Sequence, residues 1–293
     1  MFTYNTCAAL GDIDNYTVVK ILSSGESSTV DLVKDKTNGS IYVCKLQKIR
    51  PVLNINEMRN QFYKEINLLR NSSHTNIIRL IDFSDYSNFR ENNKYCYSCM
   101  YYLNEYCSGG DLLEFVKQHP LGIGEAYAKQ IFCQIVSGLN FLHSHGYAHG
   151  DIRLENLVLT NENTVKFIDF EYIKDLNTKS SDFRGSNYYM APEILRNEEF
   201  YPGIADVFAA GCVLFALVLG CPAFSEATPS DCNYRLLNLK PQEFWRRSEA
   251  RIKCNISLEL KDLLMGMIQY NPEKRINLDG VKNHNWLRVE AKL

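Results

Sequence analysis

The stretch that decides the fold reads Tyr147-Ala148-His149-Gly150-Asp151-Ile152-Arg153-Leu154-Glu155-Asn156, and Phe167-Ile168-Asp169-Phe170-Glu171 follows it closely. Together they place two acids, Asp151 and Asp169, and one amide, Asn156, on neighbouring segments. Phosphoryl transfer needs one carboxylate to orient a hydroxyl nucleophile, and further oxygen ligands to hold Mg²⁺ against a nucleotide. The two stretches therefore predict a site for phosphoryl-transfer chemistry.

Length and composition are those of a soluble globular protein. The 293 residues are 45% hydrophobic and 23% charged, which is enough for one large core or for two lobes. The formal net charge of −2 gives no electrostatic footprint for nucleic acid or an anionic membrane. We therefore expect neither of them as a partner.

The cysteines indicate a reducing compartment. The sequence has 10 of them in apolar contexts, and its first residues do not form a secretory leader. Reduced thiols that pack as small hydrophobic groups are expected, with a cytoplasmic location, and a nuclear one is not excluded. Cys96 and Cys99 have the spacing of metal ligands, but no second pair completes a zinc site.

The longest apolar run, Val207 to Leu219, predicts a helix at the centre of a large domain. The run is too short to span a bilayer, and Asp206 stands at its head. A helix that is apolar on all sides is usually buried within protein. No membrane insertion is expected.

The first third of the chain has the pattern of strands with one helix. Apolar and polar residues alternate from 16 to 46, and Asn38-Gly39 is a strong hairpin signal within this segment. A helical pattern around Glu65 follows. Two more strands are expected at Ile77 to Phe83 and Tyr95 to Tyr106, separated by a polar surface loop from Ser84 to Lys94.

Beyond Ser108-Gly109-Gly110 the pattern becomes mainly helical. Apolar residues recur at helical spacing from Ile131 to Leu142, and the chain from Ala205 onward is mostly helical in pattern. A strand-rich first third and a helix-rich remainder imply two unequal lobes in an α+β arrangement.

The two opening stretches resemble the catalytic loop, H-R-D-L-x-x-x-N, and the metal loop, D-F-G, of eukaryotic protein kinases. Gly150 replaces the arginine of the first motif and Glu171 the glycine of the second. The resemblance includes an A-P-E motif at Ala191-Pro192-Glu193 and covers about residues 16 to 287. Gly185-Ser186 and the basic residue of the catalytic loop are typical of the serine/threonine type. The apolar helix and the C-terminal run resemble the calcium/calmodulin-dependent group.

This resemblance implies a single protein kinase domain over residues 1–293 with a bilobal α+β fold. The smaller lobe, about 16–106, would be an antiparallel sheet with one main helix. The larger lobe, 109–287, would be mainly helical, and the hinge would lie at 105–108.

The resemblance also implies roles for individual residues. Asp151 would orient the substrate hydroxyl and accept its proton, and Arg153 would face the γ-phosphate of ATP. Lys45, paired with Glu65, would position the α- and β-phosphates. The family's other ATP-binding positions correspond to Leu22, Ser23, Gly25, Val30, Val43, Asn104, Glu105, Cys107, Asp111 and Val158. Asn156 and Asp169 would hold Mg²⁺; Glu171, Asp182, Ser186 and Glu193 would belong to the activation segment; Asp206 and Arg275 would be structural.

The loop expected to cover the phosphates departs from the family's G-x-G-x-x-G-x-V pattern. It is Ser23-Ser24-Gly25-Glu26-Ser27-Ser28-Thr29-Val30, which retains only the middle glycine. Ser23 and Ser28 add Cβ atoms where glycine allows close backbone approach. Taken alone, the segment is more typical of a serine-rich hairpin turn, and the resemblance of the whole chain is what indicates a phosphate-covering loop.

Two functions remain open from the sequence. An active protein serine/threonine kinase that uses ATP and Mg²⁺ is favoured because the residues for phosphate, metal and nucleophile are all present. The alternative is a pseudokinase, a nucleotide-binding or scaffolding module, which the depleted glycine loop, Gly150 and Glu171 support.

Regulation and substrate choice also follow from the resemblance. Gly150 cannot form the arginine–phosphate pair that orders activation segments, so activity without strict need for activation-loop phosphorylation is expected. Asp182 stands about where such a phosphate would attach.

Asp111 and Glu155 match acids that contact substrate arginines in relatives. A protein substrate is therefore expected, with a moderate preference for arginine three residues before the acceptor and little preference two residues before it.

Overall fold

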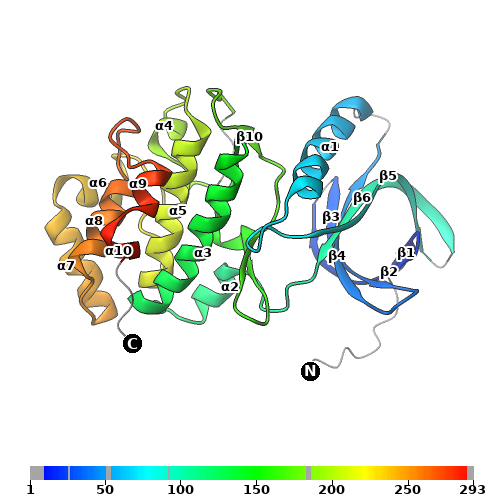
Figure 1. The fold of residues 1–293 in the computed structure, drawn as a ribbon, viewed down its shortest axis with the longest axis horizontal. Helices are drawn as coiled ribbons and strands as arrows, with labels where there is room; N and C mark the ends of the chain where they lie inside the picture. The colour runs from blue at the N-terminus through cyan, green and yellow to red at the C-terminus, as the bar shows by residue number, and fades with distance from the viewer. Residues whose placement is uncertain (1–9, 26, 51–53, 92, 183–185, 289–293) are drawn as a thin grey trace. The chain divides into compact units, whose positions relative to one another are not determined.

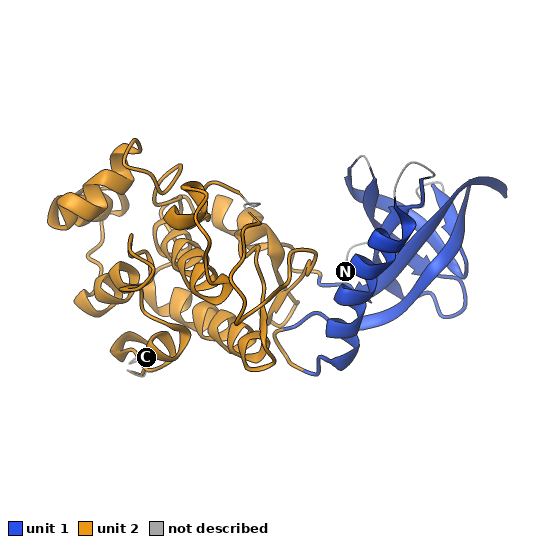
Figure 2. Cartoon of the chain, turned by 90° about the horizontal axis from the view of Figure 1, so that it is seen from above, with its two compact units in different colours: residues 1–73, 77–107 blue, residues 74–76, 108–293 orange. Residues whose placement is uncertain are grey.

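A computed structural model of the protein describes residues 10–25, 27–50, 54–91, 93–182 and 186–288. The chain divides into two compact units (Figure 2), the first comprising residues 1–73 and 77–107, the second 74–76 and 108–293. The first unit is built on a β-sheet and the second mainly on helices. The expected α+β fold class is confirmed.

The sheet of the first unit closes into a barrel of antiparallel strands (Figure 1). The strands are β1 (Gly11–Ile13), β2 (Tyr16–Ser24), β3 (Ser28–Asp35), β4 (Ile41–Lys48), β5 (Leu80–Glu91) and β6 (Lys94–Glu105). Their order around the barrel is β1-β2-β3-β4-β6-β5, and β1 closes it by pairing with both β2 and β5.

The interior of this barrel is filled by alternate side chains of its strands. Its buried residues are Ile13, Tyr16, Val18, Val33, Cys44, Leu46, Cys99, Tyr101 and Leu103. The two tyrosine hydroxyls donate hydrogen bonds, Tyr16 to Asp82 at 2.9 Å and Tyr101 to Asp14 at 2.9 Å. Because strand residues alternate between faces, the residues next to Cys44 and Leu103 lie on the opposite face of the sheet.

The expectation of a surface loop from Ser84 to Lys94 is wrong, because most of these residues extend β5 and β6. β5 continues through Glu91 and β6 begins at Lys94, so the two strands form one long hairpin. Polar side chains take part in closing the barrel, since the Ser87 hydroxyl donates to Asp14 Oδ1 at 2.6 Å. Local polarity indicated a loop, whereas pairing with β1 and β6 determines the structure.

The other elements expected in the first unit are present. Asn38-Gly39 lies in the turn that joins β3 to β4, as predicted. The predicted helix is α1 (Ile55–Asn71), whose first turn is capped by the Asn54 side chain, which accepts from Asn56 N at 3.1 Å. Its buried face carries Phe62, Glu65, Ile66, Leu68 and Leu69.

The second unit is organised around one buried helix. Its helices are α2 (Leu112–Lys117), α3 (Glu125–Ser144), α4 (Pro192–Leu195), α5 (Pro202–Leu219), α6 (Cys232–Leu239), α7 (Pro241–Ile252), α8 (Leu258–Met267), α9 (Leu278–Lys282) and α10 (Asn285–Arg288). α5 packs against α3, α8 and α9. By length and composition α5 could cross a membrane, yet 89% of it is buried inside the protein. The predicted central helix is confirmed.

Short strands fix the loops that connect these helices. β7 (Tyr147–Ala148) pairs with β10 (Lys174–Asp175), and β8 (Leu157–Leu159) pairs with β9 (Val165–Phe167). A 3₁₀ turn over Leu154–Asn156 precedes β8. The motif residues of the second unit therefore lie at the ends of strands that are hydrogen-bonded to one another.

Candidate active site

The catalytic-loop segment is held by the carboxylate of Asp206, which lies in the first half of α5. Its Oδ2 accepts from the backbone N–H of His149 at 2.8 Å, and its Oδ1 accepts from that of Gly150 at 3.0 Å. The ring Nε2 of His143, from α3, lies 3.0 Å from the same carboxylate. Three groups from residues 143–150 thus converge on one buried acid that lies 56 to 63 residues later in the chain, and this acid fixes the backbone just before Asp151.

Gly150 is required by the shape of this segment. Its φ is +80°, a left-handed conformation that glycine adopts readily. A Cβ atom at this position would collide with the carbonyl oxygen of Tyr172. The substitution that sets Gly150 apart from the family pattern therefore matches the backbone of this chain.

Asp151 and Asn156 are joined directly. Asn156 Nδ2 donates to Asp151 Oδ2 at 2.7 Å and to the Asp151 carbonyl at 2.9 Å, across the 3₁₀ turn. Burial raises the pKa of Asp151 above its ordinary value of 3.8. The neighbouring His149 and Arg153 oppose this shift, as does the Asn156 hydrogen bond, whereas the charge of Asp169 adds to it.

Asp169 is brought to this segment by the β8–β9 hairpin. The register pairs Leu157 with Phe167, and the Ile168 N–H donates to the Asn156 carbonyl at 3.0 Å. Asp169 has a φ of +59°, which is uncommon for a side-chain-bearing residue and occurs often at functional sites. Phe170 is fully buried, and its ring centroid lies 5.2 Å from that of His149.

In the first unit, Lys45 and Glu65 form a buried pair. Lys45 Nζ lies 3.7 Å from Glu65 Oε2, and the two side chains are 10% and 2% exposed. The Tyr102 hydroxyl donates to Glu65 Oε1 at 2.5 Å, and the strand register places Tyr102 opposite Lys45. The acid of α1 is therefore held on the sheet face that also carries the lysine.

Comparison with known proteins gives a match to the family described as the protein kinase domain over residues 16–287. The chain belongs to the protein kinase domain family. Similar curated proteins include the SNF-related serine/threonine-protein kinase of Homo sapiens, 30% identical over 77% of this chain and 28% of that protein. Calcium-dependent protein kinase 4 of Plasmodium berghei is 29% identical over 99% of this chain and 52% of the relative. Serine/threonine-protein kinase STK11 of Gallus gallus is 29% identical over 94% and 60%. The chain therefore spans less than two thirds of the length of these relatives.

The loop expected to cover phosphates joins β2 to β3 in the kinase domain. Ser23 pairs with Val30 across the strands, and Gly25 N donates to the Ser28 carbonyl at 2.8 Å. Leu22 is exposed. Glu26 lies outside the described residues. The loop is a strand-to-strand turn, and the roles of its residues remain predictions.

The other residues matched to nucleotide-binding positions lie in strands or next to them, some in each unit. In the first unit, Val43 pairs with Asn104, and Tyr42 with Glu105 just before Cys107. In the second unit, an isolated bridge joins Asp111 to Val158. The Asp111 side chain also caps α2, because its Oδ1 accepts from Glu114 N at 2.8 Å.

Arg153 and Glu155 form an ion pair beside Asp151. Arg153 Nη2 donates to Glu155 Oε1. Burial alone would raise the pKa of Glu155, but the hydrogen bond and charge of Arg153 lower it overall. Among the described residues, the buried atoms Arg153 Nε and Glu155 Oε2 have no hydrogen-bond partner. Each member of the pair therefore has one buried polar atom that could take a ligand.

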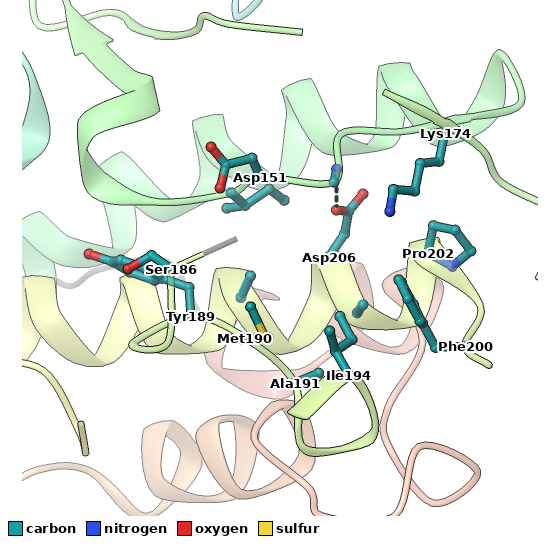
Figure 3. A pocket seen from close by; sticks show the side chains of 14 residues that line it. Asp151, Lys174, Ser186, Tyr189, Met190, Ala191, Ile194, Phe200, Pro202 and Asp206 are labelled. Carbon is teal, nitrogen blue, oxygen red and sulfur yellow. Dashed lines mark hydrogen bonds between the residues drawn. The ribbon is translucent and has the colours of Figure 1, made fainter. Parts of the chain in front are cut away.

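Lys174 is a residue that sequence reasoning missed. Its Nζ lies 3.2 Å from Ser180 Oγ, 2.9 Å from the Asp182 carbonyl and 3.4 Å from Asp182 Oδ2. The ammonium also lies 5.2 Å from the centroid of the Phe200 ring. Lys174 and Asp151 line one pocket (Figure 3). Nothing in the local pattern of β10 distinguishes this lysine from a solvated one, since its partners become neighbours only in the fold.

Glu193 and Arg275, the remaining residues of the predicted activation segment and structural set, form a buried ion pair. Arg275 donates to both oxygens of Glu193, at 2.6 and 2.8 Å, and both side chains are almost fully buried.

The Ser186 carbonyl accepts from the backbone of Tyr189 at 3.0 Å, and Ser186 lines the pocket of Figure 3. Gly185 lies outside the described residues. Glu171 is not among the residues with positive φ, so its Cβ is compatible with this backbone.

The kinase family generally uses ATP and Mg²⁺, and the residues of the second unit suit the metal. Because Asn156 Nδ2 donates to Asp151, the amide oxygen of Asn156 is left to serve as a ligand. Asp169 supplies a carboxylate close enough to influence the pKa of Asp151. Amide and carboxylate oxygens are the ligands that Mg²⁺ prefers.

The pH dependence of turnover is expected to report the raised pKa of Asp151. Because this carboxylate must be ionised to accept a proton, kcat/KM should fall on the acid side through a pKa above 3.8. Protonation of ATP affects the same range, so the residual rate of Asp151→Asn serves as the control. An acid limb of identical shape in both proteins would contradict the assignment.

Proposed function

We propose that the chain is a protein kinase that transfers the γ-phosphoryl group of ATP to serine or threonine hydroxyls of a protein substrate. The observation that carries this proposal is the hydrogen bond from Asn156 to Asp151, with Asp169 next to it and Asp206 beneath the loop. Relatives described as serine/threonine kinases support the choice of acceptor. The pseudokinase alternative is not favoured, because no residue for base, metal or phosphate is missing.

The residues would divide the reaction between them. Asp151 orients the acceptor hydroxyl and takes up its proton as the oxygen attacks the γ-phosphorus. Lys45, fixed by Glu65, holds phosphate oxygens, and Asn156 and Asp169 hold Mg²⁺. The metal, when bound, would neutralise charge on the phosphates. This chemistry depends mainly on the positions of the reacting groups and on neutralisation of the phosphate charge. The main contribution of the fold is therefore to hold Asp151 rigidly.

Loss of the metal carboxylate is expected to abolish transfer. We expect Asp169→Ala to lower transfer of labelled phosphate from ATP to a basic protein by at least about 100-fold at saturating Mg²⁺. Glu162→Gln, which changes an exposed acid in the β8–β9 turn, is the matched control and should keep the parental rate. Near-parental turnover by Asp169→Ala would show that the metal is held elsewhere.

The proposed enzyme does not strictly need a phosphate on its activation segment. The contacts of Lys174 support this proposal, because its ammonium meets the Asp182 carboxylate and the Ser180 hydroxyl without any added phosphate. Ser180 is also bridged to Phe200 through reciprocal backbone hydrogen bonds of 2.9 and 3.1 Å. Fixed charges of the chain would thus order the segment as an arginine–phosphate pair does in other switches.

Removing the lysine should therefore slow the enzyme without any change in phosphorylation. We expect Lys174→Met to lower kcat by about 10- to 100-fold because the segment shifts, and Lys174→Arg to restore most of it. Lys282→Met removes an exposed lysine of α9 and serves as the control. Phosphatase treatment of the parental protein should leave its kcat unchanged. A large loss on dephosphorylation would overturn this proposal.

The proposed substrates carry an arginine three residues before the acceptor. Support comes from the lowered pKa of Glu155, which keeps the carboxylate charged, and from its buried Oε2 atom. Asp111 is the second acid at which this preference is proposed. A peptide that lacks a basic residue at this position has no cation to pair with the carboxylates of Glu155 and Asp111.

A positional peptide library measures this preference directly. Arginine at the third position before the acceptor should raise kcat/KM several-fold, because charge-assisted pairs contribute about 1.5–3 kcal/mol at best and are screened here. Glu155→Gln should reduce the preference, whereas Glu162→Gln should not. A preference for acidic residues or for proline after the acceptor would contradict the proposal.

The proposed location of the enzyme is the cytoplasm, with a nuclear location also compatible. Nine of the cysteines lie among the described residues, and all nine carry free thiols. Such thiols are usual in a reducing compartment. Fluorescence of a tagged chain expressed in its own cell would test the location.

A further inference from the structure

A groove of about 160 Å³ lies where α6 and α7 meet the C-terminal end of α5 (Figure 1). Phe215 and Leu219 of α5 and Phe244 of α7 form an apolar floor, and all three are buried. Two exposed arginines of α7, Arg247 and Arg251, also line the groove. Among the described residues no acid lines it. The groove therefore combines an apolar floor with a positively charged rim.

The basic residues of α6 and α7 outnumber the acids that neutralise them. The basic side chains are Arg235, Lys240, Arg246, Arg247 and Arg251, and the acids are Glu243 and Glu249. Glu243 accepts from both Arg246 and Arg247, so one carboxylate serves two guanidinium groups. Glu249 is paired with Lys261, at 2.6 Å. Although the chain has a net charge of −2, this surface is positive and is complementary to an acidic partner.

Arg251 stands at the groove with its charge unneutralised. It donates to two backbone carbonyls, and within the described part of the chain it pairs with no carboxylate. A guanidinium group has five N–H donors, so two such bonds leave others for a ligand. A carboxylate at this end of the groove would form a charge-assisted hydrogen bond.

The size of the groove limits its occupant. Pockets for small molecules usually measure about 300–1,000 Å³, so this groove is too small for a drug-sized ligand or a nucleotide. Protein interfaces commonly insert one apolar side chain into such a pocket and surround it with polar contacts. Because the surrounding charge is positive, the residues on either side of the inserted side chain would be acidic.

An anionic membrane and a nucleic acid fit this surface less well. The aromatic residues of α7, Phe244 and Trp245, are buried against Phe215, with ring centroids 5.8 and 6.1 Å from it. They are thus not available to insert into a bilayer, as the apolar residues of membrane-binding helices are. The same burial withdraws them from stacking with bases.

We propose that this groove binds an acidic segment of a protein partner. One leucine or phenylalanine of the segment contacts the apolar floor, and neighbouring carboxylates pair with Arg247 and Arg251. None of the residues assigned to phosphoryl transfer lines the groove, so the inference stands apart from the proposed function.

The test uses short fluorescent peptides with a central leucine and acidic, neutral or basic flanks. Their dissociation constants are measured by fluorescence anisotropy, without nucleotide, for the parental chain, Arg247→Gln and Arg246→Gln. Arg246 is the matched control, because it is exposed and donates to the same carboxylate at 2.7 Å but does not line the groove.

The acidic peptide should bind the parental chain, and the basic peptide should not. Arg247→Gln should weaken binding about 2- to 5-fold, as expected for one exposed ion pair, and Arg246→Gln should weaken it less. Alanine in place of the central leucine of the peptide should weaken binding at least about 10-fold, because the burial of an apolar side chain is lost.

The place of binding is measured at Cys221, whose thiol lines the groove. The acidic peptide should slow alkylation of Cys221, while the exposed Cys133 of α3 reacts at its usual rate. Absent binding, an equal effect of both arginine substitutions, or an unprotected Cys221 would each overturn the inference. Binding to phosphatidylserine vesicles that the peptide does not displace would identify a membrane surface instead. Phosphoryl transfer is not measured, so failure of the proposed function would not alter these results.

Discussion

The carboxylate of Asp206 is the contact on which the second unit's chemistry depends. It is 2% exposed, and burial of a carboxylate is costly unless hydrogen bonds compensate it. The N–H groups of His149 and Gly150 and the ring of His143 provide that compensation. Because α5 is packed on all sides, this anchor cannot move independently of the core. The segment that carries Asp151 is therefore held in place on the buried central helix by hydrogen bonds.

In the proposed enzyme, fixed groups of this chain would order the activation segment without an added phosphate. Gly150 replaces the arginine of the family motif. Its φ is left-handed, and the Tyr172 carbonyl oxygen leaves no room for a Cβ atom at this position. Lys174 then meets Asp182 within the same unit. Under this proposal the pair would need no upstream enzyme, and it would also remove a point of control. Regulation of the proposed enzyme would act on the amount of protein, on its substrates, or on parts of a longer chain.

The sequence predicted what depends on short spacing and failed where partners are distant. Asn156 meets Asp151 across one 3₁₀ turn, so five residues of sequence were enough to anticipate their proximity. The Lys45–Glu65 pair was predicted from the family resemblance, because a lysine at the end of a strand is by pattern alone no different from a solvated one. Lys174 was missed because its partners, Ser180, Asp182 and Phe200, meet it only through the fold of the activation segment. The hairpin of β5 and β6 was missed because it depends on the pairing of the two strands with each other and of β5 with β1, which no local pattern records.

The most direct measurement of this account is the single-turnover rate of Asp206→Asn at saturating ATP and Mg²⁺. The amide keeps the volume of the carboxylate but loses one acceptor, so it cannot hold both backbone N–H groups. The account predicts a loss of about 100-fold in the rate, with ATP affinity nearly unchanged, in protein shown by calorimetry to be folded. A folded Asp206→Asn protein with the parental rate would contradict it.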